Sequence, residues 1–256
     1  MDRFVILMYH MVSEPQTTAE VKYACPPTRF EKHIQMLLNK GFKPISIEAV
    51  ENYYSHNTPI PDKSFLITLD DGFADNYTNA FPILQRYNIP AMIYLATGLL
   101  GKTNQWMSSP AFSERKMLSW LQIAEMVHHG IHFGSHTVSH PRLTELDDDS
   151  AYKELAQSKQ AIEDNLGIEC SHFAYPYGLF TEKTRELVRQ AGFKTACSTR
   201  SGFNNDSRDP LILHRIEVYG NDSAWKLKQK IMFGTNDANL FFPLKYYSQR
   251  LLARLG

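Results

Sequence analysis

Two pairs of side chains in this sequence have the types and the spacing that metal-assisted hydrolysis uses. Asp70 and Asp71 are adjacent carboxylates that follow the apolar run 64–69 and precede Gly72. Successive strand residues point to opposite sides, so both acids can serve one site only if the chain bends there, which glycine favours. Crowded carboxylates also have their pKa values pushed apart, which suits a metal ligand beside a general base. For this tripeptide alone, a turn in which Asp71 caps the next helix remains open.

His136 and His140 supply two imidazoles four residues apart in the stretch 135–140. On one turn of helix these rings would share a face and could hold one metal ion together. A hydrogen-bonded surface pair is the alternative for two histidines alone. Combined with one of the acids, they make a three-ligand set that leaves positions open for water and substrate. Such a site lowers the pKa of bound water toward ~7 and polarises a carbonyl.

Residues 175–178 read Tyr-Pro-Tyr-Gly, which is typical of a tight turn. The backbone N–H of Tyr177 could point at a developing oxyanion, although the motif alone predicts only a turn. Trp106 and Trp120 could stack on sugar rings, and core positions are the alternative for both.

The whole chain has 256 residues, with Lys+Arg and Asp+Glu both at 27, so its charge gives no reason to expect nucleic acid as a partner. Three cysteines without CxxC spacing predict reduced thiols rather than a disulfide framework. The apolar run 4–8 is too short for a signal-peptide core, and no segment approaches the ~18 apolar residues that cross a bilayer. We therefore expect a cytoplasmic protein.

Strand-like and helix-like segments alternate along the chain, which predicts a parallel sheet covered by helices. We expect strands at residues 4–8, 64–69, 91–95, 131–134, 171–175, 193–197 and 211–218, and helices at 28–39, 47–54, 76–87, 118–129, 148–166 and 181–191. In such sheets the ligand-handling residues follow the carboxyl ends of strands, as the acid pair, the two histidines and His10 do here.

One domain is expected over residues 1–256, with a motif-bearing core at about 64–218 and a C-terminal tail at about 236–256. Residues 97–116 form a long insertion without clear periodicity, of the kind that often serves as a lid. The aromatic and cationic residues of 240–255 could rest on an anionic membrane at its inner face, or form a helix packed on the domain.

Together these motifs resemble those of the polysaccharide deacetylase (NodB-homology) family, also called carbohydrate esterase family 4. The Thr-Phe-Asp-Asp-Gly motif of the family matches residues 68–72, with Leu69 in place of phenylalanine. Its His-(Ser/Thr)-x-x-His motif matches residues 136–140, and its Arg-x-Pro-Tyr-Gly motif matches 174–178, with Ala174 in place of arginine. The matched region covers about residues 64–202.

The resemblance implies an α/β fold, an irregular (β/α) barrel of about seven strands in a single domain. It implies that Asp70 is the general base and that Asp71, His136 and His140 hold a divalent metal ion, with zinc as the expected metal. Tyr177 would provide a backbone oxyanion donor. The implied substrate is an acetylated amino sugar of the N-acetylglucosamine type, in a polysaccharide or a lipid-linked glycan intermediate.

Two departures from the family pattern concern the base and the general acid. Ala174 lacks the guanidinium that orients the base in typical members, so another group such as Arg215 is expected to do this. His214 fits the late Leu-x-x-His pattern of the general acid. His10 fits the subgroup that deacetylates poly-N-acetylglucosamine, in which the element with this histidine comes first in a circularly permuted order. The early start of the chain and the sequence at 214–216 also favour this subgroup, and with it His10.

Other functions fit part of the pattern. Two histidines and one carboxylate also form the facial triad of non-haem iron oxygenases, but that function leaves Asp70 and the turn at 175–178 unexplained. A catalytically inactive glycan-binding domain, or an O-acetyl esterase of a polysaccharide, would keep the whole pattern. Acetate release from N-acetylated and O-acetylated glycans distinguishes these functions.

Overall fold

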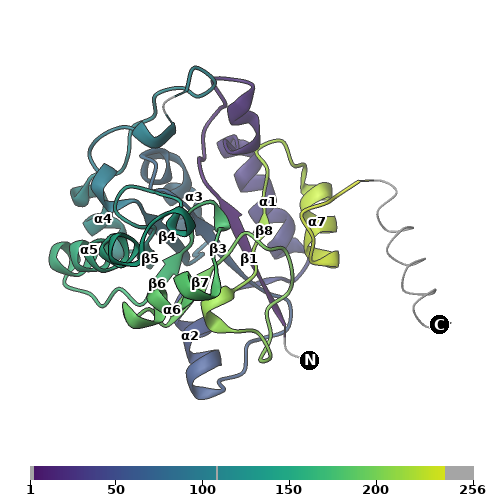
Figure 1. Cartoon of the computed structure of the whole chain (residues 1–256). Coiled ribbons are helices and arrows are strands. Elements are labelled where there is room, and N and C mark those ends of the chain that lie inside the picture. Colours follow the sequence, from purple (N-terminus) through teal and green to yellow (C-terminus); the bar gives the residue numbers. More distant parts are fainter. Residues whose placement is uncertain (1–2, 108, 240–256) are drawn as a thin grey trace, which may run out of the picture.

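A parallel sheet lies at the centre of the protein (Figure 1), whose computed structural model describes residues 3–107 and 109–239. Its strands are β1 (Phe4–Tyr9), β2 (Lys43–Pro44), β3 (Ser64–Leu69), β4 (Ala91–Leu95), β5 (Ile131–Ser135), β6 (His172–Ala174), β7 (Thr195–Cys197) and β8 (Ile216–Glu217). The order is β7-β6-β5-β4-β3-β1-β8, and β2 pairs with the first residues of β3. Because β7 and β8 stand at opposite ends of this order, the sheet is an open, irregular barrel. The predicted fold class is confirmed.

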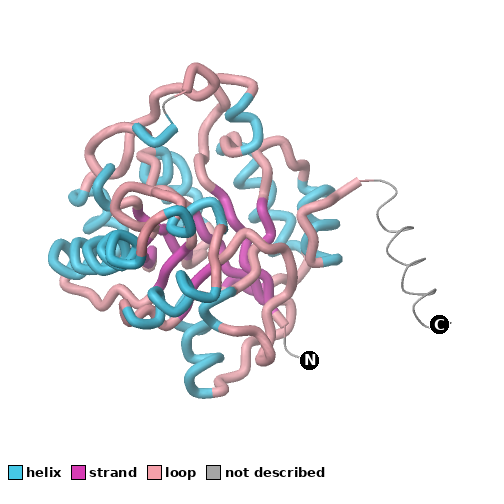
Figure 2. The backbone as a smooth tube through the Cα atoms, in the orientation of Figure 1, coloured by secondary structure: helices cyan, strands magenta, loops and turns pink. Residues whose placement is uncertain are grey.

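Helices surround this sheet, as Figure 2 shows by the cyan segments around the magenta strands. They are α1 (Pro27–Asn39), α2 (Ile47–His56), α3 (Phe81–Arg86), α4 (Trp120–Val127), α5 (Asp148–Leu166), α6 (Glu182–Gln190) and α7 (Ala224–Phe233). Strand and helix alternate along most of the chain, which is the arrangement that keeps parallel strands covered.

Alternate residues of the central strands face two different apolar cores. In β1, Phe4 and Ile6 belong to an inner cluster, whereas Val5, Leu7 and Tyr9 belong to an outer cluster. The inner cluster also contains the buried side chains of α2, which covers the amino ends of the strands, below the sheet in Figure 1. The outer cluster packs under α1 and α3 to α7. All residues of β1 and β3 are buried, as expected for strands covered on both faces.

Helix boundaries follow from capping residues that the sequence contains. The Ser46 hydroxyl accepts a backbone hydrogen bond in the first turn of α2, and the Asp147 carboxylate does the same in α5. α5 ends at Gly167, whose φ of 66° is in the left-handed region that glycine adopts without strain. The helix predicted at 148–166 is therefore confirmed at both ends.

The predicted strands at 4–8, 64–69, 91–95 and 131–134 are confirmed to within one residue, and those at 171–175 and 193–197 are present but shorter. The helix predicted at 76–87 is divided, with a π-helical turn at Asn76–Ala80 before α3. Pro82 lies in the first turn of α3, where its missing N–H costs no helical hydrogen bond.

The strand predicted at 211–218 is wrong over most of its length. Pro210–Ile212 forms a 3₁₀ turn, Leu213 makes a single parallel bridge to Cys197 of β7, and β8 alone forms a strand, which pairs with β1. The Asn204 side chain accepts a hydrogen bond from His214 N–H at 2.9 Å and donates one to His214 C=O at 2.8 Å. These are the backbone groups that a neighbouring strand would need, so the side chain replaces a strand partner there.

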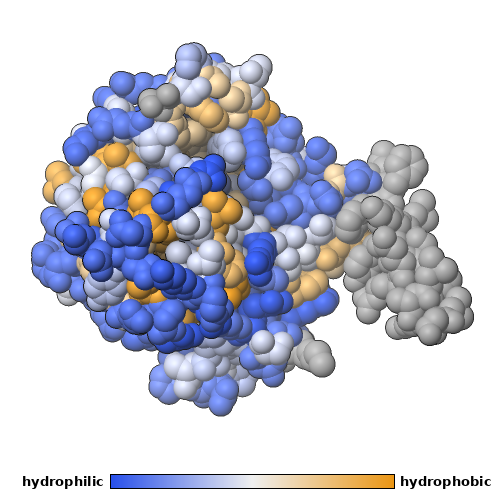
Figure 3. Space-filling view, in the orientation of Figure 1, coloured by the Kyte–Doolittle hydropathy of each residue, from blue (hydrophilic) through white to orange (hydrophobic). Residues whose placement is uncertain are grey.

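Several whole-chain expectations can be compared with the structure. The three cysteines are buried and free, as predicted. Within the described ranges, no helix is long and apolar enough to cross a bilayer. The face drawn in Figure 3 is mainly hydrophilic, with hydrophobic residues in separate small patches. Most of the expected tail at 236–256, including its proposed membrane contact, lies outside the described residues, and the single-domain assignment stays a prediction.

Candidate active site

The carboxyl ends of the parallel strands surround one cavity of about 530 Å³, which we call the strand-end cavity. Because the strands are parallel, the residues after β1, β3, β5 and β6 arrive at the same edge of the sheet. The predicted site residues that line this cavity are His10, Asp70, Asp71, His136, His140 and Tyr177. The fold therefore brings together residues that are scattered through the sequence.

Asp70 and Asp71 reach the same cavity because the chain turns at the end of β3. The Asp70 N–H still donates to Tyr9 C=O of β1 at 2.9 Å, so the sheet continues to this residue. Asp71 and Gly72 then have φ values of 75° and 83°, in the left-handed region. A side chain at position 72 would also bring its Cβ to 2.9 Å from a Leu95 methyl carbon. The bend expected at Gly72 is present, and Asp71 itself takes part in it.

His136 and His140 lie on a loop after β5, so the predicted helical turn is wrong. Thr137 and His140 have φ values of 70° and 60°, which an α-helix does not allow. Glu154 of α5 holds the loop, because its Oε2 accepts from two successive loop N–H groups at 2.7 and 2.9 Å. The centroids of the two imidazole rings are 4.8 Å apart. The Glu154 carboxylate thus holds the loop in which the two imidazoles lie close together, where a turn of helix was expected to bring them together.

Asp71, His136 and His140 form a buried group that fits a metal ion. Asp71 Oδ1 lies 3.4 Å from His136 Nε2 and 3.3 Å from His140 Nε2, and the ligand atoms lie within 4.8 Å of one another. Within the described ranges, Asp71 Oδ1 accepts no hydrogen bond. A buried carboxylate oxygen without a donor, faced by two imidazole nitrogens, is a ligand set that divalent zinc accepts. The donor atoms therefore fit a divalent cation.

The protonation states of Asp71 and His140 agree with metal binding. Burial raises the pKa of the Asp71 carboxyl, but the nearby imidazoles outweigh burial and hold this pKa far below its usual range. Burial lowers the pKa of His140, which favours the neutral ring that metals bind. For His136, burial lowers the pKa, but the Asp71 carboxylate outweighs burial. The pKa of His136 therefore lies above its usual value. His136 Nδ1 donates to Ala174 C=O at 2.7 Å, which directs Nε2 toward Asp71.

Arg215 holds Asp70 through two hydrogen bonds, from Nη1 to Oδ1 at 2.6 Å and from Nη2 to Oδ2 at 2.7 Å. The guanidinium is fully buried and also donates to Ser198 C=O at 3.0 Å and to Thr68 Oγ1 at 3.3 Å. Burial raises the pKa of Asp70, but the Arg215 charge outweighs it, so the pKa of Asp70 lies below its usual value. The replacement expected for the arginine absent at Ala174 is therefore present in contact with the acid.

The Tyr-Pro-Tyr-Gly motif forms the tight turn that the sequence predicts. Tyr177 and Gly178 have φ values of 58° and 68°, both in the left-handed region. The Tyr177 ring lies 4.7 Å from the His140 ring, and the Arg142 guanidinium lies 4.6 Å from the Tyr177 ring. The turn thus places Tyr177 beside the metal-fitting group.

His10 lies at the end of β1 and is fixed there by the segment that follows β3. Its C=O accepts a hydrogen bond from Asn76 Nδ2 at 2.9 Å. The neighbouring Asp75 carboxylate accepts from Asn76 Nδ2 and from Val12 N–H, both at 3.0 Å. The His10 ring meets the Tyr23 ring edge-on, with centroids 5.3 Å apart. His10 therefore lies in the strand-end cavity together with the carboxylates.

His214 lies outside the described lining of that cavity. Its ring is half-buried and lies directly against Gly202. A Cβ added at position 202 would come to 2.2 Å from His214 Nδ1. Burial and the charges of Arg208 and Arg200 lower the pKa of His214 to about 4. Of the two histidines that the sequence offers as general acid, only His10 lines the cavity.

Some residues of the cavity wall were missed by sequence reasoning, because no local motif marks them. Lys22, Tyr23, Phe112 and Arg142 line the cavity. They come from surface segments whose meeting depends on the tertiary fold. Trp106, one of the tryptophans expected to contact sugar, also lines the cavity. Trp120 instead packs against the outer core from α4.

Sequence comparison connects this site with a known family. The family model described as polysaccharide deacetylase matches residues 57–196, which include Asp70, Asp71, His136 and His140. The poly-β-1,6-N-acetyl-D-glucosamine N-deacetylase of Staphylococcus aureus (strain MSSA476) is 28% identical over 212 residues. This match covers 79% of the chain and 70% of that protein.

Solved structures show the same architecture. The Streptococcus pyogenes deacetylase PplD, in complex with acetate, superposes with a TM-score of 0.77 at 30% identity, covering 90% of this chain and 98% of that one. IcaB from Ammonifex degensii superposes with a TM-score of 0.75 at 27% identity, covering 85% and 92%. The resemblance seen in the motifs is thereby confirmed, and the chain belongs to the polysaccharide deacetylase family.

Proposed function

We propose that this protein is a metal-dependent hydrolase that removes N-acetyl groups from amino sugars of the N-acetylglucosamine type in a glycan. One observation carries the proposal: a metal-fitting group of Asp71, His136 and His140 lies in the same cavity as an ionised Asp70 held by Arg215. The name of the Staphylococcus aureus relative supports an N-acetylated glucosamine polymer as the substrate class.

Asp70 is the general base in this proposal. A divalent cation on Asp71, His136 and His140, zinc in our proposal, would supply a Lewis acid that polarises the acetamide carbonyl. Asp70 accepts a proton from the attacking water, whose oxygen forms a bond to the carbonyl carbon. Arg215 keeps the base ionised and fixes both of its oxygens, so little reorganisation is needed when water attacks.

Two further groups complete the hydrolysis. The backbone N–H of Tyr177 stabilises the negative charge that develops on the carbonyl oxygen. His10 donates a proton to the amide nitrogen as the carbon–nitrogen bond breaks, which leaves acetate and a free amino sugar. Water is the nucleophile, so no covalent bond to the protein forms.

Acetate release from a panel of acetylated glycans tests the function. The panel contains poly-β-1,6-N-acetylglucosamine oligomers, chitin oligomers, lipid-linked N-acetylglucosamine and O-acetylated xylan. We expect acetate and an equal amount of free amine from the N-acetylated substrates, with zinc present and not after chelation. Asp70→Asn is the matched control, since it alters one atom of the base and none of the ligands.

Two results would contradict the proposal. Release from acetylated xylan alone would make the protein an O-acetyl esterase. A metal-loaded protein that binds an N-acetylated oligomer and releases no acetate from any substrate would be a glycan-binding domain on this scaffold.

A further inference from the structure

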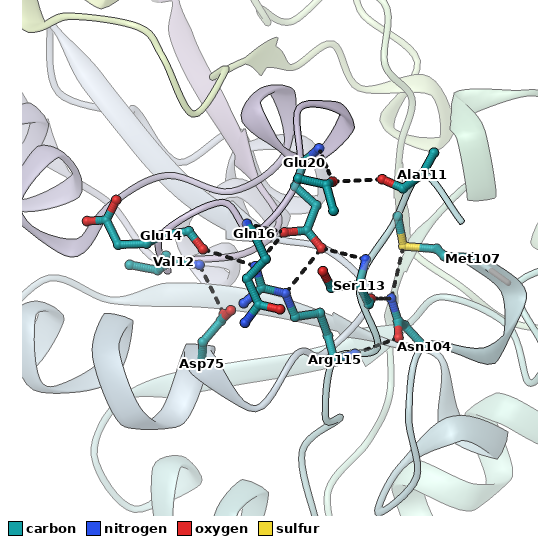
Figure 4. Close-up of polar contacts among 11 residues, drawn as sticks. Val12, Glu14, Gln16, Glu20, Asp75, Asn104, Met107, Ala111, Ser113 and Arg115 are labelled. Atoms are coloured by element: carbon teal, nitrogen blue, oxygen red, sulfur yellow. Dashed lines mark hydrogen bonds and ion pairs between the residues drawn. The ribbon is translucent and has the colours of Figure 1, made fainter. Parts of the chain in front are cut away.

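Glu20 is a fully buried carboxylate outside the catalytic group, in the 3₁₀ turn Ala19–Lys22. Each of its two carboxylate oxygens accepts two hydrogen bonds, as Figure 4 shows. Oε2 accepts from Gln16 N–H at 2.7 Å and from Arg115 Nη2 at 2.5 Å. Oε1 accepts from Ser113 N–H at 3.0 Å and from Arg115 Nε at 3.3 Å. A buried charge is stable only when it is paired and hydrogen-bonded in this way.

These bonds join two segments that are far apart in the sequence. The first is the entry segment, residues 14–23, and the second is the insertion segment, residues 101–107 and 109–116. They lie side by side at the top of Figure 1. Thr17 Oγ1 adds a link between them, because it donates to Ala111 C=O at 2.7 Å. The two segments are therefore joined directly to each other.

Inside the insertion segment, Asn104 orders the backbone next to this link. Asn104 Oδ1 accepts from Arg115 N–H at 2.7 Å, and Asn104 Nδ2 donates to Ser113 C=O at 3.1 Å. Arg115 Nη2 also donates to Glu14 C=O of the entry segment at 3.0 Å. Hydrogen bonds thus hold both the backbone and the guanidinium of Arg115. They fix the geometry of its ion pair with Glu20.

Both segments supply aromatic rings to the strand-end cavity. Tyr23 comes from the entry segment, and Trp106 and Phe112 come from the insertion segment. The Tyr23 and Phe112 centroids are 6.1 Å apart, and the Trp106 centroid is 5.1 Å from that of His140. Flat aromatic faces with few polar groups around them are typical of ligand pockets. We call these three rings the aromatic wall.

The charge of Glu20 persists at neutral pH. Burial raises the pKa of the Glu20 carboxyl, but hydrogen bonds from Arg115 and from the Gln16 and Ser113 N–H groups outweigh burial and lower this pKa. The pair therefore stays ionised at neutral pH, so the two segments remain joined before substrate arrives. A preassembled surface loses less conformational entropy on binding than one that must be ordered by its ligand.

We propose that Glu20 and Arg115 are positioning residues, which hold Tyr23, Trp106 and Phe112 as one aromatic wall that binds a sugar ring next to the one that loses its acetyl group. The substrate is then an oligomer of at least two sugars rather than a single sugar. This inference rests on the proposed function for its catalytic readout, and on direct binding for an independent one.

Glu20→Gln tests the proposal. Each carboxylate oxygen accepts from a backbone N–H and from Arg115, so the amide nitrogen of glutamine faces hydrogen-bond donors in either orientation. We expect the KM for an N-acetylglucosamine pentamer to rise about tenfold, which corresponds to about 1.4 kcal/mol of binding free energy. The kcat stays within about twofold of wild type, because ground-state binding and not the chemical step is altered.

The control is Glu31→Gln, which breaks an ion pair with Arg86 (2.7 Å) between α1 and α3, outside the described lining of the cavity. Its KM should equal that of wild type. Thr17→Val removes the hydrogen bond to Ala111 at an exposed position, so it should fold and raise KM in the same direction by a smaller factor. If Glu20→Gln does not fold, Thr17→Val decides the question.

If Glu20→Gln leaves the KM for the pentamer unchanged, or lowers kcat equally for substrates of every length, the proposed role of the aromatic wall is wrong. If the wild-type protein releases no acetate from any amino sugar, the proposed function fails, and calorimetric titration with the same pentamer still tests the wall. Pentamer binding about tenfold weaker in Glu20→Gln than in wild type and Glu31→Gln supports it. Equal or absent binding rejects it.

Discussion

Arg215 and Asp70 are joined by two hydrogen bonds of 2.6 and 2.7 Å although 145 positions separate them in the sequence. Arg215 precedes β8 at one end of the sheet order, whereas Ala174, where the family motif has its arginine, ends β6 near the other end. The guanidinium therefore reaches the acid from the opposite end of the sheet order. A buried, forked ion pair fixes both the orientation and the ionisation of a carboxylate.

Arg215→Lys should lower kcat about 10²-fold while the metal content stays at the wild-type level. Lysine keeps the charge but cannot form two parallel hydrogen bonds, so the base loses its orientation more than its ionisation. Steady-state kinetics with metal analysis measures both quantities, and Arg189→Lys on the surface of α6 is the control. A wild-type kcat in Arg215→Lys would show that the fork has no catalytic role.

The two adjacent acids should respond differently to the same change. Asp70→Asn should retain the metal and lose turnover by about 10²–10⁴-fold, the range of general-base catalysis. Asp71→Asn should lose metal affinity as well, because its Oδ1 faces both imidazoles. Metal analysis of the two purified variants separates these outcomes. The reverse pattern would mean that the roles are exchanged.

Metal removal should reduce stability as well as activity. A ligand that binds only the folded state stabilises it by about 2.7 kcal/mol at 100 times its Kd, so zinc added to chelated protein should raise the Tm. His140→Ala should abolish this zinc-dependent shift, and His56→Ala at an exposed position should not. Differential scanning calorimetry with and without zinc is the measurement. An undiminished shift in His140→Ala would remove this residue from the ligand set.

The general acid is expected at His10. His10→Ala should lower kcat by about 10²-fold or more with the metal retained, because His10 lines the cavity beside both carboxylates. His214→Ala should keep most of the turnover and lower the unfolding free energy, since its half-buried ring lies outside the described lining. Kinetics and urea unfolding of both variants test this. A large loss of kcat in His214→Ala alone would reverse the assignment.

Stability should fall as pH falls from about 6.5 to about 4, partly because of His33 on α1. Burial lowers the pKa of His33 to about 4, and its ring exchanges hydrogen bonds with Tyr9 and the Asp222 backbone. In this window the unfolded chain binds a proton that the folded chain does not, so protonation favours unfolding, by on the order of 3 kcal/mol.

Urea unfolding at about pH 7 and about pH 4.5 measures this pH effect. His33→Gln should flatten the pH dependence, because an amide can donate and accept as the neutral ring does and does not titrate. His56→Gln, at an exposed position, should leave the curve unchanged. A wild-type slope in His33→Gln would assign the effect to other groups.

The parts of the fold that depend on neighbours in the chain were determined by the sequence itself. The apolar runs before His10 and Asp70 form buried parallel strands, and α5 begins after Asp147 and ends at Gly167. Capping, turn formation and hydrophobic runs act over a few residues, so their consequences are visible without the fold. The order of the motifs and their placement after strands was sufficient to predict the family and the six site residues that line the cavity, but not Lys22, Tyr23, Phe112 and Arg142 of its wall.

The tertiary structure alone decided which distant groups meet. The helical spacing of His136 and His140 predicted a helix, but Glu154 holds a loop there from 15 and 16 positions away. Asn204 bonds the backbone N–H and C=O of His214 where a strand was expected, and His10 rather than His214 lines the cavity. These contacts depend on how strands and surface segments register in space. Local propensities contain no information about that register, because it is fixed by the packing of the whole sheet.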